Sequence, residues 1–185
     1  RYLLMLNYEV EPAVLAPLLP AGVVLDTWQG KTLVSMVGFL FLNPRVLGVP
    51  VPFHRNFEEV TLRFYVRREV EGELRRGVVF VKELVPKPWI ARIARWVYHE
   101  NYAALPMGHT IERDRQGKLC PEALVEYTWK YHRRGHDHRR QHRLGGMLLG
   151  EPALPQPGSE ESFITEHYWG YTRLGKRKTG EYQVE

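Results

Sequence analysis

The chain has 185 residues, and its 26 Lys and Arg against 21 Asp and Glu give a formal net charge of +5. This length suits one domain, and 44% hydrophobic with 25% charged residues is typical of a folded globular protein, which excludes a largely disordered chain. The single cysteine, Cys120, excludes an intramolecular disulfide framework and indicates a reducing, cytoplasmic setting, and no apolar run or signal-peptide pattern predicts a membrane segment.

The first part of the chain predicts two strands, a short helix and a long loop. Residues 1–10 are apolar and predict an early strand, and a proline in the first turn suits a short helix over 11–19. Residues 31–42 are apolar at both alternating positions, which is typical of a strand covered on both sides; Gly38 within it indicates a bend or a bulge. The proline-rich residues 43–57 predict a long loop, of the length that often serves as a functional lid.

The clearest alternation of apolar and polar residues runs from 58 to 68. One face of this predicted strand is apolar, while Glu59, Arg63 and Tyr65 share the other face. If that face points into a barrel, it supplies a carboxylate, a guanidinium and a phenol to one cavity; if it points outward, it is a solvated face. His54, Arg55 and Asn56, at the end of the preceding loop, add potential donors for an anion.

Lys82 stands in the next predicted strand, 76–85, which is apolar on both faces. A lysine in such a setting must reach water, pair with an acid or lose its proton. Desolvation lowers the pKa of a lysine and makes its amine a usable nucleophile or base. The alternative is a structural ion pair with Glu58 or Glu59 at a sheet edge.

The second half predicts an amphipathic helix and several further strands. The helix begins at Pro88 and extends to about Tyr98, with Trp89, Ile93 and Val97 expected to face inward. Strands are expected over 107–113, 123–131, 139–144, 167–173 and 179–184, and a short helix begins after the capping residue Ser159. Many strands and three short helices, without regular alternation, predict an α+β fold with a mainly antiparallel, curved or barrel-like sheet.

One segment, 130–143, contains six of the basic residues and a single acid, so it accounts for the whole net charge. Its histidines lack a carboxylate or cysteine at a metal-binding spacing, so no metal is expected. A solvated hairpin tip and a surface that contacts nucleic acid or an acidic partner both remain open, although no nucleic-acid-binding motif accompanies the segment. No glycine-rich phosphate or dinucleotide motif is present either, so no cofactor is expected.

Several segments carry a resemblance to a known family. They are NYEVEPAVLAPLLPAGVVLDTWQGKTLVSMVGF, HRNFEEVTLRFYVR, RRGVVFVKELVPKP, YHENY and SEESFITEHYWGYT. They resemble the YqjF-like uncharacterised family, also called domain of unknown function 2071, over nearly the whole chain. The resemblance implies a single domain over 1–185, trimmed at both ends relative to the family's pattern.

The family in turn is distantly similar to the acetoacetate decarboxylase-like superfamily, which implies a cone-shaped antiparallel β-barrel with a few short flanking helices. The segment EVTLRFYV resembles a decarboxylase strand whose active-site glutamate would be Glu59. The segment FVKE resembles the phrase F-P-K-K, which would place the Schiff-base lysine at Lys82. Glu83 stands where the decarboxylases have a second lysine, and a carboxylate there favours the charged amine. Acetoacetate decarboxylase activity itself is therefore not expected.

Two functions are predicted. The first is an internal pocket for a small carboxylate or carbonyl compound, used by a lysine-dependent lyase or hydrolase on oxo-acids if the protein is an enzyme. Its catalytic pair is Lys82 and Glu59, and its ligand-binding residues are Arg63, Tyr65, Glu83, His54, Arg55 and Asn56. The second is a non-enzymatic binding protein that uses 130–143 to contact nucleic acid or an acidic partner. The sequence leaves open whether the chain forms a homo-oligomer.

Overall fold

The computed structural model describes residues 1–42, 45–46, 49–50, 56–98, 100–132, 139–151 and 153–184. The strands are β1 (Leu4–Glu9), β2 (Val24–Leu25), β3 (Leu33–Leu42), β4 (Arg45–Val46), β5 (Val49–Pro50), β6 (Asn56–Val70), β7 (Glu73–Val85), β8 (Tyr102–Ala104), β9 (Met107–Ile111), β10 (Leu124–His132), β11 (Arg139–Met147), β12 (Trp169–Arg173) and β13 (Thr179–Gln183). The helices are α1 (Pro12–Leu15), which continues as a 3₁₀ turn (Ala16–Leu18), α2 (Pro88–Tyr98) and α3 (Glu160–Thr165).

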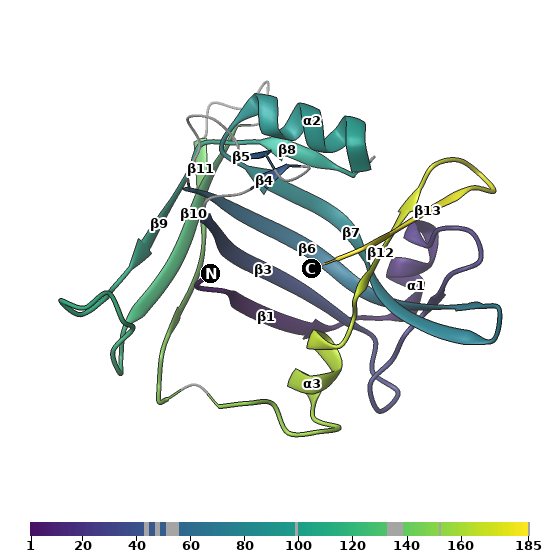
Figure 1. Ribbon diagram of the computed structural model, residues 1–185, viewed down its shortest axis with the longest axis horizontal. Coiled ribbons are helices and arrows are strands. Elements are labelled where there is room, and N and C mark those ends of the chain that lie inside the picture. The colour runs from purple at the N-terminus through teal and green to yellow at the C-terminus, as the bar shows by residue number, and fades with distance from the viewer. Residues whose placement is uncertain are drawn as a thin grey trace.

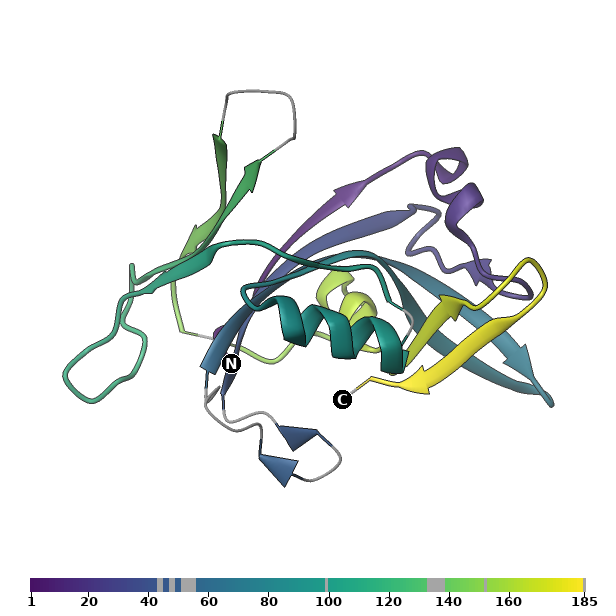
Figure 2. The same ribbon diagram turned by 90° about the horizontal axis from the view of Figure 1, so that it is seen from above.

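A strongly curved main sheet organises the molecule (Figure 1). Its strand order is β1-β3-β6-β7-β12-β13, with β2 paired to β6 and β8 paired to β7. Helices α2 and α3 lie inside the curve, on the concave face, as the view from above shows (Figure 2). A second sheet, β11-β10-β9, and α1 lie on the convex face. The predicted mixture of mainly antiparallel strands and few short helices is confirmed.

The predicted closed cone is not confirmed. Among the described strands the order of the main sheet is open, with β1 and β13 at its two ends. Two of its pairings, β7 with β8 and β7 with β12, are parallel, and the others are antiparallel. The fold is therefore an open, curved sheet whose concave face is covered by α2, α3 and the C-terminal hairpin.

Strand β6 is buried on both faces, although its sequence alternates between apolar and polar residues. Phe64 is 0% exposed and packs on the convex side with Leu15 of α1, while the neighbouring Tyr65 is 1% exposed and packs on the concave side with Phe163 of α3. Glu59 and Thr61 lie on the same face as Tyr65 and are buried as well. The polar face of the predicted strand thus points to the inside of the curve and not to solvent.

A β-bulge interrupts the pairing of β6 with β7. Leu62 lies opposite Lys82, but Arg63 lies opposite Phe80, so Val81 has no partner in the register. Because side chains alternate along a strand, one extra residue reverses the facing of every residue that follows it. The side-chain amide of Asn101 donates to the Val81 carbonyl over 3.0 Å, which satisfies the backbone at the bulge.

Gly38 lies in unbroken strand pairing and is a site of close approach. It pairs with Leu4 of β1 on one side and with Val60 of β6 on the other, and the register does not shift at either pair. A Cβ atom at this position would lie 2.6 Å from a ring carbon of Tyr127 on β10. Of the bend or bulge predicted from this glycine, the bulge is therefore wrong. Its absent side chain lets the three-stranded sheet dock against β3.

Two helices show how local sequence sets their orientation. The side chain of Ser159 accepts a hydrogen bond from Ser162 N over 3.2 Å, which confirms the predicted cap of α3. In α2 the buried residues are Ala91 and Ala94, whereas Ile93 is 44% exposed, so the prediction that Ile93 faces inward is wrong. Small residues allow α2 to lie close to β7 and β8.

No helix in the described part of the chain is long and apolar enough to cross a membrane.

Candidate functional site

The concave face of β6 brings together three of the residues predicted from the sequence. Glu59, Arg63 and Tyr65 share this face, and Glu59 is only 5% exposed. The phenol of Tyr65 is used within the core, since its oxygen lies 2.5 Å from Ser35 Oγ. Asn56 is exposed at the start of β6, and the predicted contributors His54 and Arg55 lie outside the described residues, as does most of the predicted lid loop.

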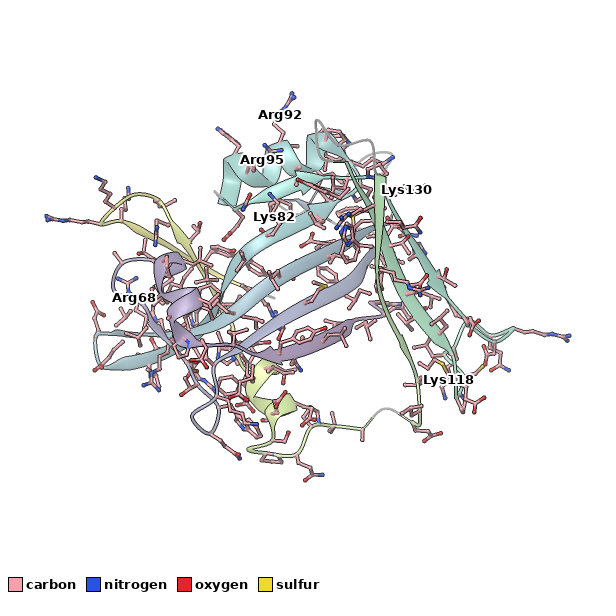
Figure 3. The ribbon with its side chains drawn as sticks, turned by 180° about the vertical axis from the view of Figure 1, so that it is seen from behind. Arg68, Lys82, Arg92, Arg95, Lys118 and Lys130 are labelled. Carbon is pink, nitrogen blue, oxygen red and sulfur yellow. The ribbon has the colours of Figure 1, made fainter. Side chains whose placement is uncertain are left out.

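Lys82 is not brought together with Glu59. It lies opposite Leu62, whose side chain faces the convex side, and its amine donates to the side-chain oxygen of Asn101 over 2.8 Å in an exposed setting (Figure 3). Without the bulge, Lys82 would share the concave face with Phe80; with it, Glu83 takes that place. The neighbour of Glu59 across the strands is therefore another acid, Glu83, and not the predicted amine of Lys82.

Five side chains form a carboxyl cluster on the concave face, beside α2. Its members are Glu59 on β6, Glu83 on β7, Glu100 just before β8, Tyr102 on β8 and Tyr182 on β13. Glu83 and Tyr102 are register partners. The phenol of Tyr102 donates to Glu59 Oε1 over 3.5 Å, and that of Tyr182 donates to Glu100 Oε1 over 2.7 Å. Two tyrosines thus hydrogen bond to carboxyl groups that have no basic partner among the described residues.

Burial makes these carboxyl groups hold their protons. It raises the pKa of Glu59 to about 8, against a smaller lowering by the Tyr102 hydrogen bond. Burial, together with the negative charges of Glu59 and Glu100, raises the pKa of Glu83 to about 9. Burial also raises the pKa of Glu100 to about 7 and moves that of Tyr102 well above its ordinary value. At neutral pH, Glu59 and Glu83 are therefore uncharged acids that can give a proton away.

Three buried polar atoms on this side of the sheet have no hydrogen-bond partner among the described residues. They are Glu83 Oε2, Arg63 Nε and, beside Tyr65, His167 Nδ1. Glu83 lies opposite Thr61, which stands midway between Glu59 and Arg63 on β6, so Glu83 and Arg63 occupy neighbouring positions on one face. The other end of the Arg63 guanidinium donates to the Ile164 carbonyl over 3.3 Å and lies 5.7 Å above the Tyr65 ring. An acid and a cation with unused hydrogen-bonding capacity therefore lie on the same face, at neighbouring register positions.

A second buried polar cluster joins α3 to the main sheet. Asp26 Oδ2 lies 2.8 Å from Arg76 Nε and 3.1 Å from His167 Nε2, and Arg67 lies 3.5 Å from its other oxygen. Although burial opposes it, hydrogen bonds from His167 and Arg76 hold the pKa of Asp26 below its ordinary value. Burial lowers the pKa of His167, so this histidine is neutral at neutral pH. The cluster ties segments far apart in the sequence and has a structural role.

Strands β10 and β11, which the basic segment 130–143 joins, pair antiparallel from Leu124 to His132, as the predicted hairpin requires. The rings of Trp129 and His142 stack with centroids 5.6 Å apart. The tip, 133–138, lies outside the described residues, so its role as a contact surface stays a prediction. Among the residues that the structure does describe, no group of three or more His, Cys, Asp or Glu side chains is placed to hold a metal ion.

Sequence reasoning missed Glu100, Tyr102 and Tyr182, and also the pair Asp26 and His167. Glu100 and Tyr102 lie within YHENY, a polar segment that follows the end of an amphipathic helix. A strand of three residues such as β8 is too short to show an alternation. Tyr182 is brought to Glu100 only by the docking of the C-terminal hairpin, for which the local sequence gives no signal.

Comparison with known proteins agrees with this fold. The chain is 37% identical over 170 residues to the "Uncharacterized protein YqjF" of Bacillus subtilis (strain 168), and it covers 64% of that protein. An acetoacetate decarboxylase-like enzyme from Sphingomonas wittichii RW1 has a similar structure, with a TM-score of 0.64 and 17% identity over 98% of this chain and 69% of the other.

The enduracididine biosynthesis enzyme MppR is a further structural neighbour. With HEPES buffer bound it matches with a TM-score of 0.59 and 13% identity, over 92% of this chain and 59% of MppR. Its complex with pyruvate matches with a TM-score of 0.50 and 16% identity, over 74% of this chain and 51% of MppR. At such identities these likenesses show a shared fold. The family model described as "Uncharacterized conserved protein (COG2071)" matches residues 1–185, and the chain therefore belongs to that family, DUF2071.

Proposed function

We propose that the concave face binds a small oxo-acid between Arg63 and Glu83 and exchanges protons with its carbonyl group. The observation that carries the proposal is the pair of buried atoms without a partner, Arg63 Nε and Glu83 Oε2, at neighbouring positions on this face. A buried polar atom without a hydrogen bond is costly, so a ligand that supplies both bonds gains affinity. An oxo-acid has a carboxylate for the guanidinium and a carbonyl oxygen for the acid.

The coupled acids Glu59 and Glu83 can catalyse enolisation of such a ligand. When the pair has lost one of its two protons, the carboxylate takes a proton from the carbon next to the carbonyl. The electron pair of the broken C–H bond forms the carbon–carbon double bond, and the remaining acid gives its proton to the carbonyl oxygen. The pair thereby keeps the same number of protons, and no metal or cofactor is required.

The similar structures support the choice of ligand class. MppR has been captured with pyruvate, which is a small 2-oxo-acid, and this chain matches about half of that protein. The likeness supports the fold of the site, whereas the residues proposed to act are those of this chain.

The position of Lys82 separates this proposal from a lysine-dependent mechanism. Its amine faces the convex side and bonds to Asn101, so the proposal assigns the proton transfer to the carboxyl groups. Borohydride trapping with pyruvate, read by mass spectrometry, tests the difference. We expect no covalent adduct at Lys82; an adduct there would replace the carboxyl mechanism with the Schiff-base chemistry that the sequence predicts.

The direct test is the exchange of the pyruvate methyl protons for deuterium, followed by NMR in D₂O. We expect exchange above the buffer rate, and a loss of about a hundredfold in Glu83→Gln and in Glu59→Gln, because an amide cannot transfer a proton. Both variants should still bind pyruvate in saturation-transfer experiments, whereas Arg63→Gln should bind it more weakly. Glu58→Gln, next to Glu59 but on the opposite face, is the matched control and should exchange at the unmodified rate.

The pH profile provides a second criterion. The singly ionised pair is most abundant between pH values of about 8 and about 9, because these are the pKa values of Glu59 and Glu83. Exchange should therefore rise toward this interval and decline above it. Exchange that is unchanged in the Glu59→Gln, Glu83→Gln double variant would refute the proposal.

A further inference from the structure

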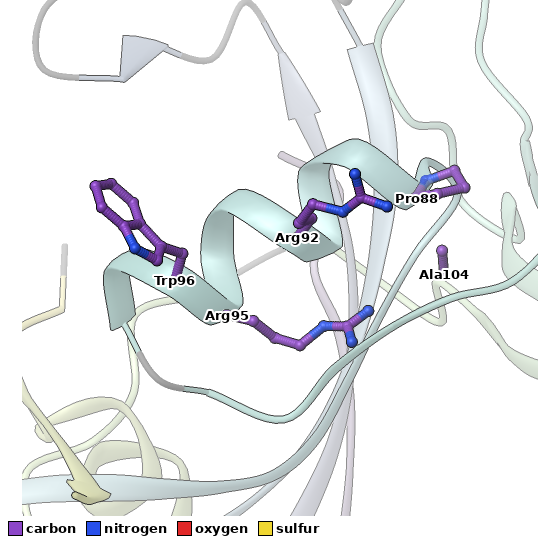
Figure 4. Close-up of a pocket in the computed structure, with 5 residues that line it drawn as sticks. All are labelled: Pro88, Arg92, Arg95, Trp96 and Ala104. Atoms are coloured by element: carbon purple, nitrogen blue, oxygen red, sulfur yellow. The ribbon is translucent and has the colours of Figure 1, made fainter.

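The outer flank of α2 borders a hollow of about 400 Å³. Its lining residues are Pro88, Arg92, Arg95, Trp96 and Ala104 (Figure 4). Both arginines are exposed, and Trp96 is 80% exposed, an unusually large fraction for a tryptophan. The hollow lies between the helix and β8, outside the carboxyl cluster, and the proposed function makes no use of it.

The positive charge around the hollow is not neutralised. No ion pair involves Arg92 or Arg95 among the described residues, and the one hydrogen bond made by either guanidinium is that of Arg95 Nε to the Ala91 carbonyl, over 3.1 Å. The first turn of α2 contains no acid, in contrast to α3, whose first turn has Glu160 and Glu161. The exposed Lys87, just before the first residue of α2, adds a third cation near Pro88.

The two guanidiniums are placed to act on one ligand. Residues three apart on a helix are neighbours on its surface, and Arg92 and Arg95 extend on the side of Pro88 and Ala104 (Figure 4). The small side chain of Ala104 leaves space between the helix and the strand. A guanidinium presents N–H groups in a fork that fits the oxygens of a carboxylate or a phosphate.

We propose that this hollow binds an organic oxyanion, a carboxylate or a phosphate monoester, through Arg92 and Arg95. Trp96 forms an apolar wall at the end of the hollow for the body of the ligand. An anionic membrane surface fits less well, because a membrane-bound helix buries its apolar face in lipid. In α2 that face already packs on the sheet, with Ala91 0% and Ala94 8% exposed.

Titration calorimetry with four probes tests the proposal and separates the sources of the anion. Phenyl phosphate and benzoate each combine a ring with an oxyanion, inorganic phosphate has only the anion, and benzyl alcohol has only the ring. We expect saturable binding of one or both ring oxyanions, weaker binding of phosphate and none of benzyl alcohol. Arg92→Gln and Arg95→Gln should each weaken binding by about tenfold, the worth of one charge-assisted hydrogen bond.

Arg140→Gln is the matched control, because it removes one exposed arginine from β11, a strand of the second sheet that does not line the hollow. It should leave the affinity unchanged. An equal loss of affinity in Arg140→Gln would show unspecific attraction and overturn the proposal. So would the absence of binding at low ionic strength, or binding to anionic vesicles without any binding of the small anions. Pyruvate exchange should be unaffected by Arg92→Gln, which keeps this test separate from that of the concave face.

Discussion

At the scale of single residues, the buried acid Glu83 is the residue on which the proposed chemistry of the concave face depends most. It is 3% exposed, lies near two further carboxyl groups and has an oxygen without a partner. A carboxyl group in such a place is stable only in its protonated form, because burial of an uncompensated charge is costly. The same property that makes it a proton donor makes the fold sensitive to high pH.

The Glu83→Gln substitution should reveal this sensitivity. The folded protein holds the Glu83 proton up to a pH of about 9, whereas the unfolded chain loses it near the ordinary value of 4.5. Between these values each pH unit removes up to about 1.4 kcal/mol from the free energy of unfolding. Glutamine does not titrate, so the variant should match the unmodified protein at pH 5 and be more stable at pH 9, as measured by urea unfolding followed by circular dichroism.

Glu58→Gln serves as the control here too, since Glu58 is paired with His109 over 2.6 Å on the opposite face of β6. The effect of Glu58→Gln on the free energy of unfolding should be similar at pH 5 and pH 9, whereas the effect of Glu83→Gln should grow between these values. If Glu83→Gln shifted stability by the same amount at both values, Glu83 would not be the buried proton holder described above.

At the scale of elements, the strands were predictable from the sequence but the facing of one critical segment was not. The alternation along β6 placed Glu59, Arg63 and Tyr65 on one face, as the structure has them. In β7 the apolar run is continuous, so its sequence contains no period that could locate a bulge. The bulge turns Lys82 to the convex side and Glu83 to the concave side. One residue of register thus decides which of the two side chains, Lys82 or Glu83, lies on the face of Glu59.

Asp26 is the residue that holds α3 and β7 together, and Asp26→Asn should weaken that link. Asparagine cannot balance Arg76 and Arg67, so we expect a loss of about 3 kcal/mol in the free energy of unfolding at neutral pH, the usual cost of breaking a buried ion pair. The pKa of Asp26 is lowered, so its contribution is present at neutral pH and disappears as the pH falls through that lowered value. The difference between the two proteins should therefore shrink in acid, as denaturant titrations will measure.

Glu73→Gln provides the comparison, since it breaks an ion pair of 3.0 Å with Arg75 in which Glu73 is 64% exposed. Exposed pairs contribute about 1 kcal/mol or less. Asp26→Asn should be clearly more destabilising, and equal losses in the two variants would contradict the role of Asp26 as a buried link.

At the scale of the whole molecule, the residues that give the chain its net charge are not those of the candidate site. The excess of basic residues lies in 130–143, on the hairpin of β10 and β11, while the concave face holds acids that are neutral at neutral pH. Net charge therefore indicates little about the candidate site. Glu59 and Glu83 were visible in the sequence as polar groups within apolar strands, whereas Glu100, Tyr102 and Tyr182 were not. The pKa values of the cluster follow only from the packing of segments that are distant along the chain.

The parallel contact of β12 with β7 has a consequence for the order of folding. Trp169 pairs with Gly77, far away in sequence, whereas β6 and β7 form a hairpin closed by the short turn at Gly72. Closing a long loop costs more chain entropy than closing a short one, so β12 and β13 should dock last and open first. Hydrogen exchange read by mass spectrometry should find amides of β13 exchanging sooner than those of β6; equal protection would refute this order.

Tyr182, on β13, is the partner of Glu100. When the hairpin opens, water reaches Glu100 and the free-energy cost of ionising it falls. The carboxylate that then forms opposes the return of β13, because closing the hairpin would bury its charge. The exposed carboxyl group loses its proton near its ordinary pKa of 4.5, whereas the closed protein holds it up to a pKa of about 7. Raising the pH from 4.5 to 7 should therefore prolong the open state, and only an acidic solution should hold the hairpin firmly closed.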